Sequence, residues 1–352
     1  MNADALDAIC AIIQEDAGNR GLRTDPAENL ITACAGDFQR ACQSLAQTPQ
    51  ASVAIVTGFF IPHGQPPCGE TDGPLGAILL ARALTHLGIR VVLASDAFCL
   101  PALEAGLVAS KLVEAVPVVA LPSVEKARDL SSSEYWQTFR EQSGPISHLI
   151  ALERVGPSHT ADSIQAQNGN AADARARYLA EAPAEHHDCC HTMRGRNITM
   201  YTSPAHRLFE EAGRQTPRIA TVGIGDGGNE IGMGKIPWDV IRRNIPNGGR
   251  VACRVATDHL IVCGVSNWGA YGLAAGVRLL RGAAPDSELF DLERERSILR
   301  MMVEGGPLVD GISGRPELSV DGFPFERYVE PLVRLAFVRK SECGEKPRNG
   351  CQ

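Results

Sequence analysis

Long apolar runs and an excess of basic residues are both missing from this 352-residue sequence. The longest apolar stretch, residues 75–87, is interrupted by Arg82, Thr85 and His86 and is shorter than the ~20 residues that span a bilayer. Asp and Glu number 41 against 34 Lys and Arg, and the net charge of −7 disfavours binding to phosphate backbones. We therefore expect neither a membrane nor a nucleic acid among the partners.

Sorting signals, disulfide frameworks and common catalytic motifs are scarce as well. The N-terminus lacks the basic region of a secretory signal and is too acidic for a mitochondrial transit peptide, so a cytoplasmic location is expected. The eleven cysteines are scattered and include no Cys-x-x-Cys pair. We find no P-loop, no Gly-x-Ser-x-Gly elbow and no His-Glu-x-x-His. These absences disfavour several frequent mechanisms of hydrolysis and phosphoryl transfer.

The sequence instead alternates short apolar, β-branched runs with helix-like stretches. Runs at 53–58 and 90–95 flank a helical pattern at about 75–87, and this spacing predicts parallel strands joined by a right-handed crossover. The alternation continues along the chain, with further strands expected at 251–257 and 260–265. We therefore predict an α/β fold with a doubly wound, mainly parallel sheet, a Rossmann-like three-layer sandwich.

The pattern also predicts how the chain is divided. Residues 1–50 are expected to form a helical segment packed against the main fold, because their apolar positions recur at helical spacing. Residues 51–340 are expected to form a single α/β domain, since no linker-like break divides the strands. Within that domain, residues 157–192 are polar and aperiodic, which is typical of an insertion or a lid. Residues 341–352 are expected to be a flexible tail.

The first loop expected at the carboxyl edge of the sheet contains Thr71, Asp72 and Gly73. The start of a helix presents free backbone N–H groups and a positive dipole end, which suit a carboxylate or phosphate. Glu70 and Asp72 would oppose an anion unless a cation intervenes or the ligand carries an amine. A simple capped helix after a long loop explains the same residues equally well.

The second loop, residues 223–232, holds five glycines in ten residues around Asp226 and Glu230. It matches the dinucleotide pattern Gly-x-Gly-x-x-Gly, but Pro237 falls where the following helix should run. Asp226 and Glu230 could act as acid and base or could ligate Mg²⁺ or Mn²⁺. Glycine also lets the backbone approach a ligand closely. The expected substrate contacts here are Gly225, Gly227, Gly228 and Asn229.

A third segment places Asp258 and His259 between two predicted strands and Ser266 and Asn267 at the start of a helix. Histidine exchanges protons readily near neutral pH, so Asp258 and His259 are candidate catalytic residues. Asp258 alternatively forms a turn. Ser266 and Asn267 either begin a second anion-binding helix or act simply as its cap.

Two arginines, Arg194 and Arg196, flank a glycine after the polar stretch. Guanidinium groups bind carboxylates through two parallel hydrogen bonds, so this pair is a candidate substrate anchor. A solvated pair of surface arginines is the equally open alternative.

These segments together resemble the C-terminal domain of the D-glutamate cyclase family. The likeness extends over residues 30–338 and is carried by residues 70–74, 193–195, 223–235, 257–262 and 264–269. The resemblance implies dehydration of D-glutamate to 5-oxo-D-proline, a hydro-lyase reaction on a small acidic amino acid. Vertebrate members carry a second domain upstream, so a homo-oligomer or an upstream-type domain supplied in trans is a compatible partner. The reaction requires neither ATP nor nicotinamide.

This reaction needs a base, an acid and an electrostatic anchor. We expect Asp226, Glu230 or the Asp258–His259 pair to move protons, and Arg194 or Arg196 to hold the α-carboxylate. Backbone N–H groups of the glycine loop, or the two helix starts, would hold the γ-carboxylate. A divalent cation on Asp72, Asp226 or Glu230 would replace part of this machinery. A nucleotide or phosphate-ester binder and a non-catalytic subunit remain the alternative functions.

Overall fold

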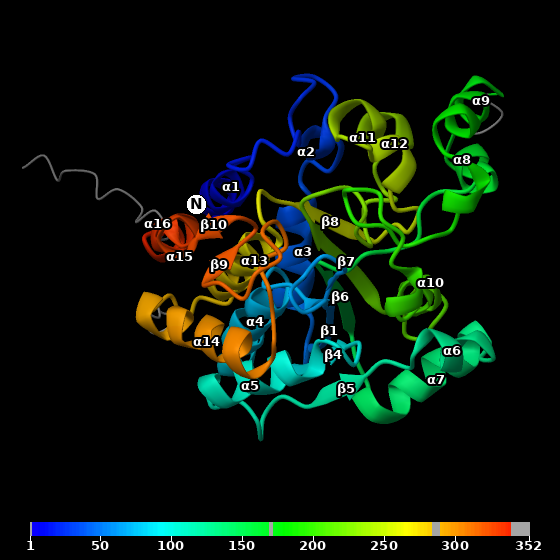
Figure 1. Ribbon diagram of the computed structural model, residues 1–352. Coiled ribbons are helices and arrows are strands. Elements are labelled where there is room, and N and C mark those ends of the chain that lie inside the picture. Colours follow the sequence, from blue (N-terminus) through cyan, green and yellow to red (C-terminus); the bar gives the residue numbers. More distant parts are fainter. Residues whose placement is uncertain (1, 169–171, 284–288, 339–352) are drawn as a thin grey trace, which may run out of the picture.

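The computed structural model describes residues 2–168, 172–283 and 289–338, so the expected tail at 341–352 lies outside the described residues. A six-stranded parallel sheet lies between two layers of helices (Figure 1). The strands of this sheet lie in the order β5-β4-β1-β6-β7-β8. Their bounds are β1 Ser52–Thr57, β4 Arg90–Ser95, β5 Val118–Ala120, β6 His148–Leu152, β7 Ala220–Gly225 and β8 His259–Val262. The predicted α/β, doubly wound fold is confirmed.

The sheet is buried on both faces, which explains its almost continuous apolar strands. In β1, Val53 and Ile55 belong to one hydrophobic core, whereas Ala54 and Val56 belong to the other. The chain builds the sheet outward from β1 to β5 and then returns to build β6 to β8 on the other side. The order therefore reverses between β1 and β6, and ligands of such sheets bind at the carboxyl ends beside this reversal.

The helices of the first layer share one core with α13 at its centre. The N-terminal segment belongs to this layer, because Ile13 in α1 and Cys42 in α3 contact glycines of α13. The expected helical segment at the N-terminus therefore packs directly against the sheet layer. These helices are α1 Asn2–Ile13, α3 Asp37–Gln47, α4 Pro74–His86, α5 Leu100–Ser110, α13 Ser266–Leu280, α14 Leu292–Gly305, α15 Phe325–Tyr328 and α16 Glu330–Ala336.

The second layer corrects two sequence expectations. Residues 157–192 were expected to lack regular structure, but part of this range forms the helices α8 and α9, in which the side chains of Ile164 and Tyr178 are buried. Residues 251–257 are not a strand: after Val251 the chain makes isolated bridges with neighbouring loops. The second layer and its connections contain α2 Leu30–Ala33, α6 Val124–Arg128, α7 Ser132–Ser143, α8 Ala161–Asn168, α9 Ala172–Glu181, α10 His206–Ala212, α11 Trp238–Asn244, α12 Gly248–Val251 and the short 3₁₀ turns Ala184–His186 and Thr199–Tyr201.

Two small hairpins that the sequence did not predict complete the carboxyl edge. The Thr71 N–H donates to Val309 O at 2.9 Å and its hydroxyl donates to Ser319 O at 2.9 Å, so the two hairpin regions are joined. The strands are β2 Phe60–Ile61 with β3 Cys68–Gly69, and β9 Ser319–Val320 with β10 Phe323–Pro324.

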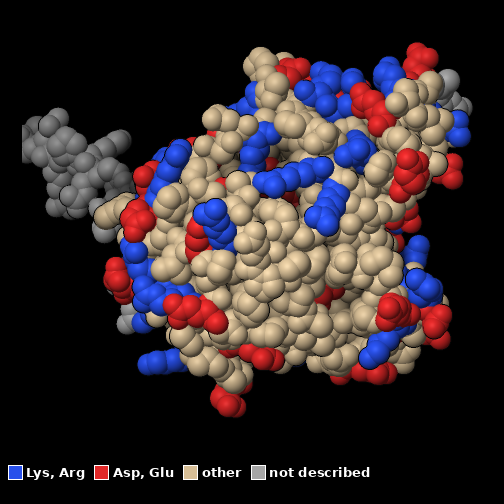
Figure 2. Space-filling model, in the orientation of Figure 1, with Lys and Arg blue, Asp and Glu red and all other residues tan. Residues whose placement is uncertain are grey.

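The described residues include no helix long and apolar enough to cross a membrane. In the orientation of Figure 1, Lys and Arg side chains gather on the upper part of the surface (Figure 2). A broad area below them carries few charged side chains of either sign (Figure 2). The acidic residues described next are therefore a feature of the interior rather than of this face.

Candidate active site

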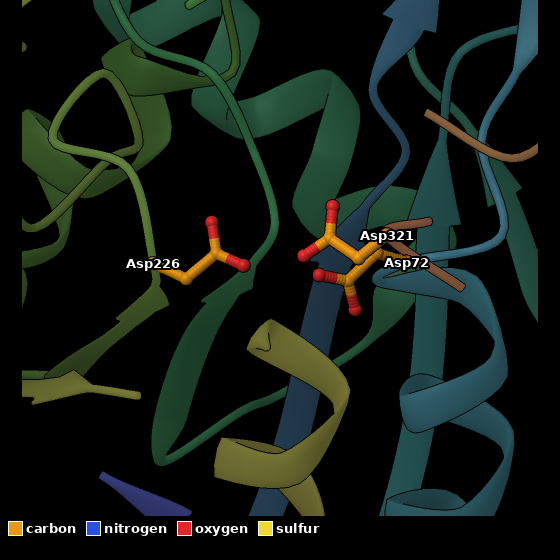
Figure 3. Close-up of side chains that lie close together, drawn as sticks. All are labelled: Asp72, Asp226 and Asp321. Carbon is orange, nitrogen blue, oxygen red and sulfur yellow. The ribbon is translucent and has the colours of Figure 1, made fainter. Parts of the chain in front are cut away.

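Carboxylates from separate loops converge at the carboxyl edge of the sheet. Asp226 and Glu153 directly follow β7 and β6, and Asp72 precedes α4. Asp321 lies in the turn between β9 and β10, and Asp226 faces it and Asp72 across the gap (Figure 3). One oxygen from each of Asp72, Asp226 and Asp321 lies within 4.8 Å of the other two. The same holds for Glu153, Asp226 and Glu230, so Asp226 belongs to both groups.

Asp72 is held at the cluster by an exchange of caps between α4 and α13. Its carboxylate accepts the backbone N–H groups of Ser266 at 2.9 Å and Asn267 at 2.8 Å, and so caps α13. Asn267 Oδ1 accepts the N–H groups of Gly73 at 2.8 Å and Gly76 at 2.7 Å, and so caps α4. Both helix starts that were expected to bind an external anion therefore already hold a side chain of the protein.

The glycine-rich loop is also occupied from within. The Glu230 carboxylate accepts the backbone N–H groups of Asp226 at 3.0 Å, Gly227 at 2.7 Å and Gly228 at 2.7 Å. A Cβ atom on Gly225 would lie 2.9 Å from the Glu230 carboxyl carbon, so a larger residue there would displace this side chain. In this structure the N–H groups that were expected to hold a substrate carboxylate hold Glu230 instead.

Arg20 reaches the cluster from the loop between α1 and α2. Its Nη1 donates to Asp226 Oδ1 at 2.9 Å, and its Nη2 forms an ion pair with Asp321. The backbone of this loop is fixed by Asp16, which accepts the N–H groups of Arg20 at 2.8 Å and Leu22 at 3.0 Å. The N-terminal segment thus contributes a cation to the carboxyl edge.

Asp321 and Glu153 are both held in left-handed backbone conformations. Asp321 has φ 60°, and its loop is organised by Asp310, which accepts the Gly322 N–H at 2.7 Å. Glu153 has φ 45° and accepts the Ser266 hydroxyl at 2.5 Å. Non-glycine residues adopt this region at a cost, and such residues concentrate at functional sites.

Burial raises the pKa of the Asp72, Glu153 and Asp226 carboxyl groups, because charge is costly away from water. The pKa of Asp226 is raised well above its usual range by burial, although Arg20 opposes the shift. The pKa of Glu153 is raised by burial and by the nearby Glu230. Burial is also the main cause that raises the pKa of Asp72 to about 7. Such groups accept and release protons closer to neutral pH than exposed carboxylates do.

The donor set fits a hard divalent cation. Mg²⁺ and Mn²⁺ prefer carboxylate and other oxygen ligands. The buried Oδ2 atoms of Asp226 and Asp321 have no hydrogen-bond partner in the described structure. The buried Thr57 hydroxyl also has no hydrogen-bond partner in the described structure. A Cβ atom on Gly73 would lie 2.6 Å from this hydroxyl, so a larger residue at position 73 would crowd it. Asp72, Asp226 and Asp321 form one group of oxygens that could hold such an ion, and Glu153, Asp226 and Glu230 form the other.

Asp258 and His259 do not join this cluster. His259 begins β8, so the pair lies at the amino edge of the sheet. The Asp258 carboxylate is bound there by Arg218 and by the N–H and hydroxyl of Thr221. The sequence predicted that Asp258 and His259 would follow a strand at 251–257. This prediction was wrong, because those residues form no strand and the pair instead precedes the rest of β8.

The other predicted substrate contacts surround the cluster. Asn229 Nδ2 donates to His191 O at 2.8 Å, which joins the glycine loop to the segment that carries the two candidate arginines. Arg194 and Arg196 are both exposed, and Arg194 Nη2 donates to Ile312 O at 3.0 Å. They therefore lie outside the buried cluster.

Sequence reasoning missed Arg20, Glu153 and Asp321. Glu153 carried a usable signal, because it ends the strand expected at 148–153, at the edge where ligands bind. Asp321 precedes a glycine, a pair that is also typical of a plain turn. Arg20 carried no signal, because its role depends on where the N-terminal loop packs.

The fold and the site define an α/β protein with a buried carboxylate cluster at the carboxyl edge of its parallel sheet. The chain belongs to the family described as D-glutamate cyclase-like, C-terminal, which matches residues 9–178 and 178–336. It is 30% identical over 364 residues to human D-glutamate cyclase, mitochondrial, which covers 94% of this chain. The chain spans 51% of the length of that relative.

Among solved structures, a short-chain dehydrogenase/reductase from Serratia marcescens aligns with 62% of this chain and 99% of its own length. The sequences are 16% identical and the TM-score is 0.23. This score is too low to indicate a shared fold. The parallel sheet and its strand order define the fold.

Proposed function

We propose that this protein is a D-glutamate cyclase-like hydro-lyase that converts D-glutamate to 5-oxo-D-proline and water. The observation that carries this proposal is the 30% identity to human D-glutamate cyclase across 94% of the chain. The buried carboxylates agree with it, because the reaction requires proton transfer at an amine and at a carboxyl group.

The proposed reaction forms one bond and breaks another. The α-ammonium group gives up two protons as its nitrogen forms a bond to the γ-carboxyl carbon, and one carboxyl oxygen takes up two protons, breaks its bond to that carbon and leaves as water. Asp226 is our candidate for the base, because its carboxylate lies at the carboxyl edge of the sheet, beside Arg20, and keeps one oxygen without a hydrogen-bond partner in the described structure. Glu153 is a candidate acid for the departing hydroxyl, since its pKa is raised as well. Glu230 positions the loop that carries Asp226.

We also propose that Asp72, Asp226 and Asp321 hold a divalent cation, Mg²⁺ or Mn²⁺. Bound there, the ion would polarise the γ-carboxyl group and offset the negative charge of the cluster. Glu230 was an expected ligand, but Asp226 and Asp321 each retain a buried oxygen without a hydrogen-bond partner in the described structure and Glu230 does not, so we place Glu230 behind the ion rather than on it.

The direct test is a proton NMR time course of the full chain with D-glutamate, L-glutamate as control, and Mn²⁺ in parallel tubes. We expect 5-oxoproline from the D isomer alone. Asp226→Asn should abolish the signal, whereas Asp129→Asn, an exposed change on another loop, should retain it. No product in any tube would reject the activity for this chain by itself. Product that appears only after mixing with the remaining part of a longer relative would favour the partner-dependent alternative.

The nucleotide-binding alternative has one observation in its favour. Numbered along the chain, the sheet strands lie in the order 3-2-1-4-5-6, which is also the order of dinucleotide-binding folds. However, the phosphate site of those folds is the helix start after the first strand, and here Asn267 fills it. Thermal shifts with NAD or ATP would revive this alternative, and flat responses would remove it.

A further inference from the structure

The charge of the cluster creates a problem for an acidic ligand. Asp72, Glu153, Asp226 and Asp321 are acidic, and an acidic amino acid would add two more carboxylates. Among the residues that the structure describes, the ion pairs to this group come from Arg20. An anionic ligand therefore needs either a bound cation or Arg20 itself.

Arg20 lies on the solvent side of the carboxylates that it contacts. Its side chain is 20% exposed, compared with 2% for Asp226 and 5% for Asp321. The contacts with the two aspartates engage one nitrogen each, and a guanidinium carries further N–H donors. A ligand that approaches from solvent would therefore meet Arg20 before it meets Asp226.

We infer that Arg20 binds the α-carboxylate of the substrate and thereby directs its ammonium group toward Asp226. This inference rests on the proposed function. The α-carboxylate and ammonium are attached to the same carbon, so a carboxylate held at Arg20 leaves the ammonium beside the carboxylate that Arg20 contacts. The N-terminal segment thus supplies a specificity-determining residue to a site formed by the α/β domain.

This assignment differs from the one that the sequence favoured. Arg194 and Arg196 are exposed, and Arg194 already donates to a backbone carbonyl of the 310–322 loop. Arg20, in contrast, is fixed through Asp16 and is held in contact with the candidate base. A preorganised guanidinium loses less entropy when it binds a carboxylate than a mobile one does.

The test compares D-glutamate with its α-amide, which keeps the amine and the γ-carboxyl group but lacks the α-carboxylate. We expect Arg20→Gln to lower kcat/KM for D-glutamate by about 10- to 100-fold, the usual effect of losing a hydrogen bond to a charged group. The value for the amide should hardly change. Damage to the fold would instead lower both values together. Arg23→Gln, an exposed change on the same loop, is the matched control and should leave the ratio intact.

The outcomes separate this inference from the proposed function. A wild-type protein that turns over neither compound rejects the proposed function and the inference with it. An active wild-type protein whose preference survives in Arg20→Gln overturns the role of Arg20 alone, and so does a loss of preference in Arg194→Gln instead. If Arg20→Gln does not fold, Arg20→Lys decides, because a lysine cannot offer two parallel N–H bonds. We expect a folded Lys variant to lose about 2- to 10-fold of the preference, and an unchanged preference overturns the inference.

Discussion

Asp72 and Asn267 each cap the helix that the other begins. The Asp72 carboxylate accepts two N–H groups from the start of α13, and the Asn267 side chain accepts two from the start of α4. The Asn267 amide is oriented by this geometry, because its oxygen must face the two donors. The exchange fixes the position of a candidate metal ligand relative to the sheet.

Removing one cap should therefore be more costly than removing a surface cap. We expect Asn267→Ala to lower the free energy of unfolding by about 2 kcal/mol, because it leaves the buried N–H group of Gly76 without an acceptor and the Gly73 N–H with Asp72 Oδ1 alone. Ser131→Ala removes an exposed cap of α7 and should cost about 1 kcal/mol. Urea denaturation measures both. Equal losses would show that the exchange of caps contributes nothing beyond an ordinary cap.

The glycine loop offers a prediction of chemical rescue. Glu230→Ala should empty the site formed by the N–H groups of residues 226–228 and destabilise the protein by about 2–4 kcal/mol. Formate carries the same carboxylate group, so adding it should raise the melting temperature of Glu230→Ala more than that of the wild type. Glu230→Gln keeps one acceptor oxygen and should show an intermediate loss. Identical responses to formate would mean that the loop does not depend on its carboxylate.

The proposed cation site predicts a selective gain of stability. Mn²⁺ binds only the folded site, so it should raise the melting temperature of the wild type in a concentration-dependent way. Asp226→Asn and Asp321→Asn should each reduce that gain, because each removes a ligand oxygen with a full charge. Asp129→Asn is the exposed control. A gain that all three variants share would place the ion elsewhere on the protein.

The sequence predicted the sheet well because each strand is a short apolar run between turn signals. It also led to Asp72, which lies in the predicted first loop, and to Asp226, which directly follows strand β7. It could not show that Glu230 fills the glycine loop, since a nearby carboxylate is equally compatible with an empty loop that awaits a ligand. It misplaced Asp258 and His259, because the strand expected at 251–257 does not form and the pair lies at the amino end of β8.

Arg20 illustrates the same limit for long-range contacts. It lies 206 positions before Asp226 in the sequence, in a loop with no periodicity, and the two are brought together by the packing of α1 on α13 and by hydrogen bonds from this loop to Asn244 in α11. The helices within residues 157–192 were missed for another reason. Their two short helices are held by a few buried side chains, such as Tyr178, rather than by a full apolar stripe.

A buried acid outside the cluster, Glu295 in α14, predicts how the stability of the protein depends on pH. Glu295 in α14 is 1% exposed, and it contacts the Tyr271 hydroxyl, which in turn contacts that of Tyr328. Burial raises the pKa of Glu295 to about 7, although the positive charge of Arg82 lowers it. In the unfolded chain the same carboxyl group ionises near its ordinary value of 4.5.

The sign of the effect follows from this difference. Between pH 4.5 and about 7 the unfolded chain loses the proton of Glu295 while the folded protein keeps it. Ionisation thus favours the unfolded state, and this residue should lower the free energy of unfolding by about 1.4 kcal/mol per pH unit across that window. Glu295→Gln retains an acceptor for Tyr271 and should remove this part of the slope. Glu304→Gln, exposed on the same helix, should not. Denaturation curves at pH 5, 6 and 7 measure the three slopes, and parallel lines for wild type and Glu295→Gln would contradict the prediction.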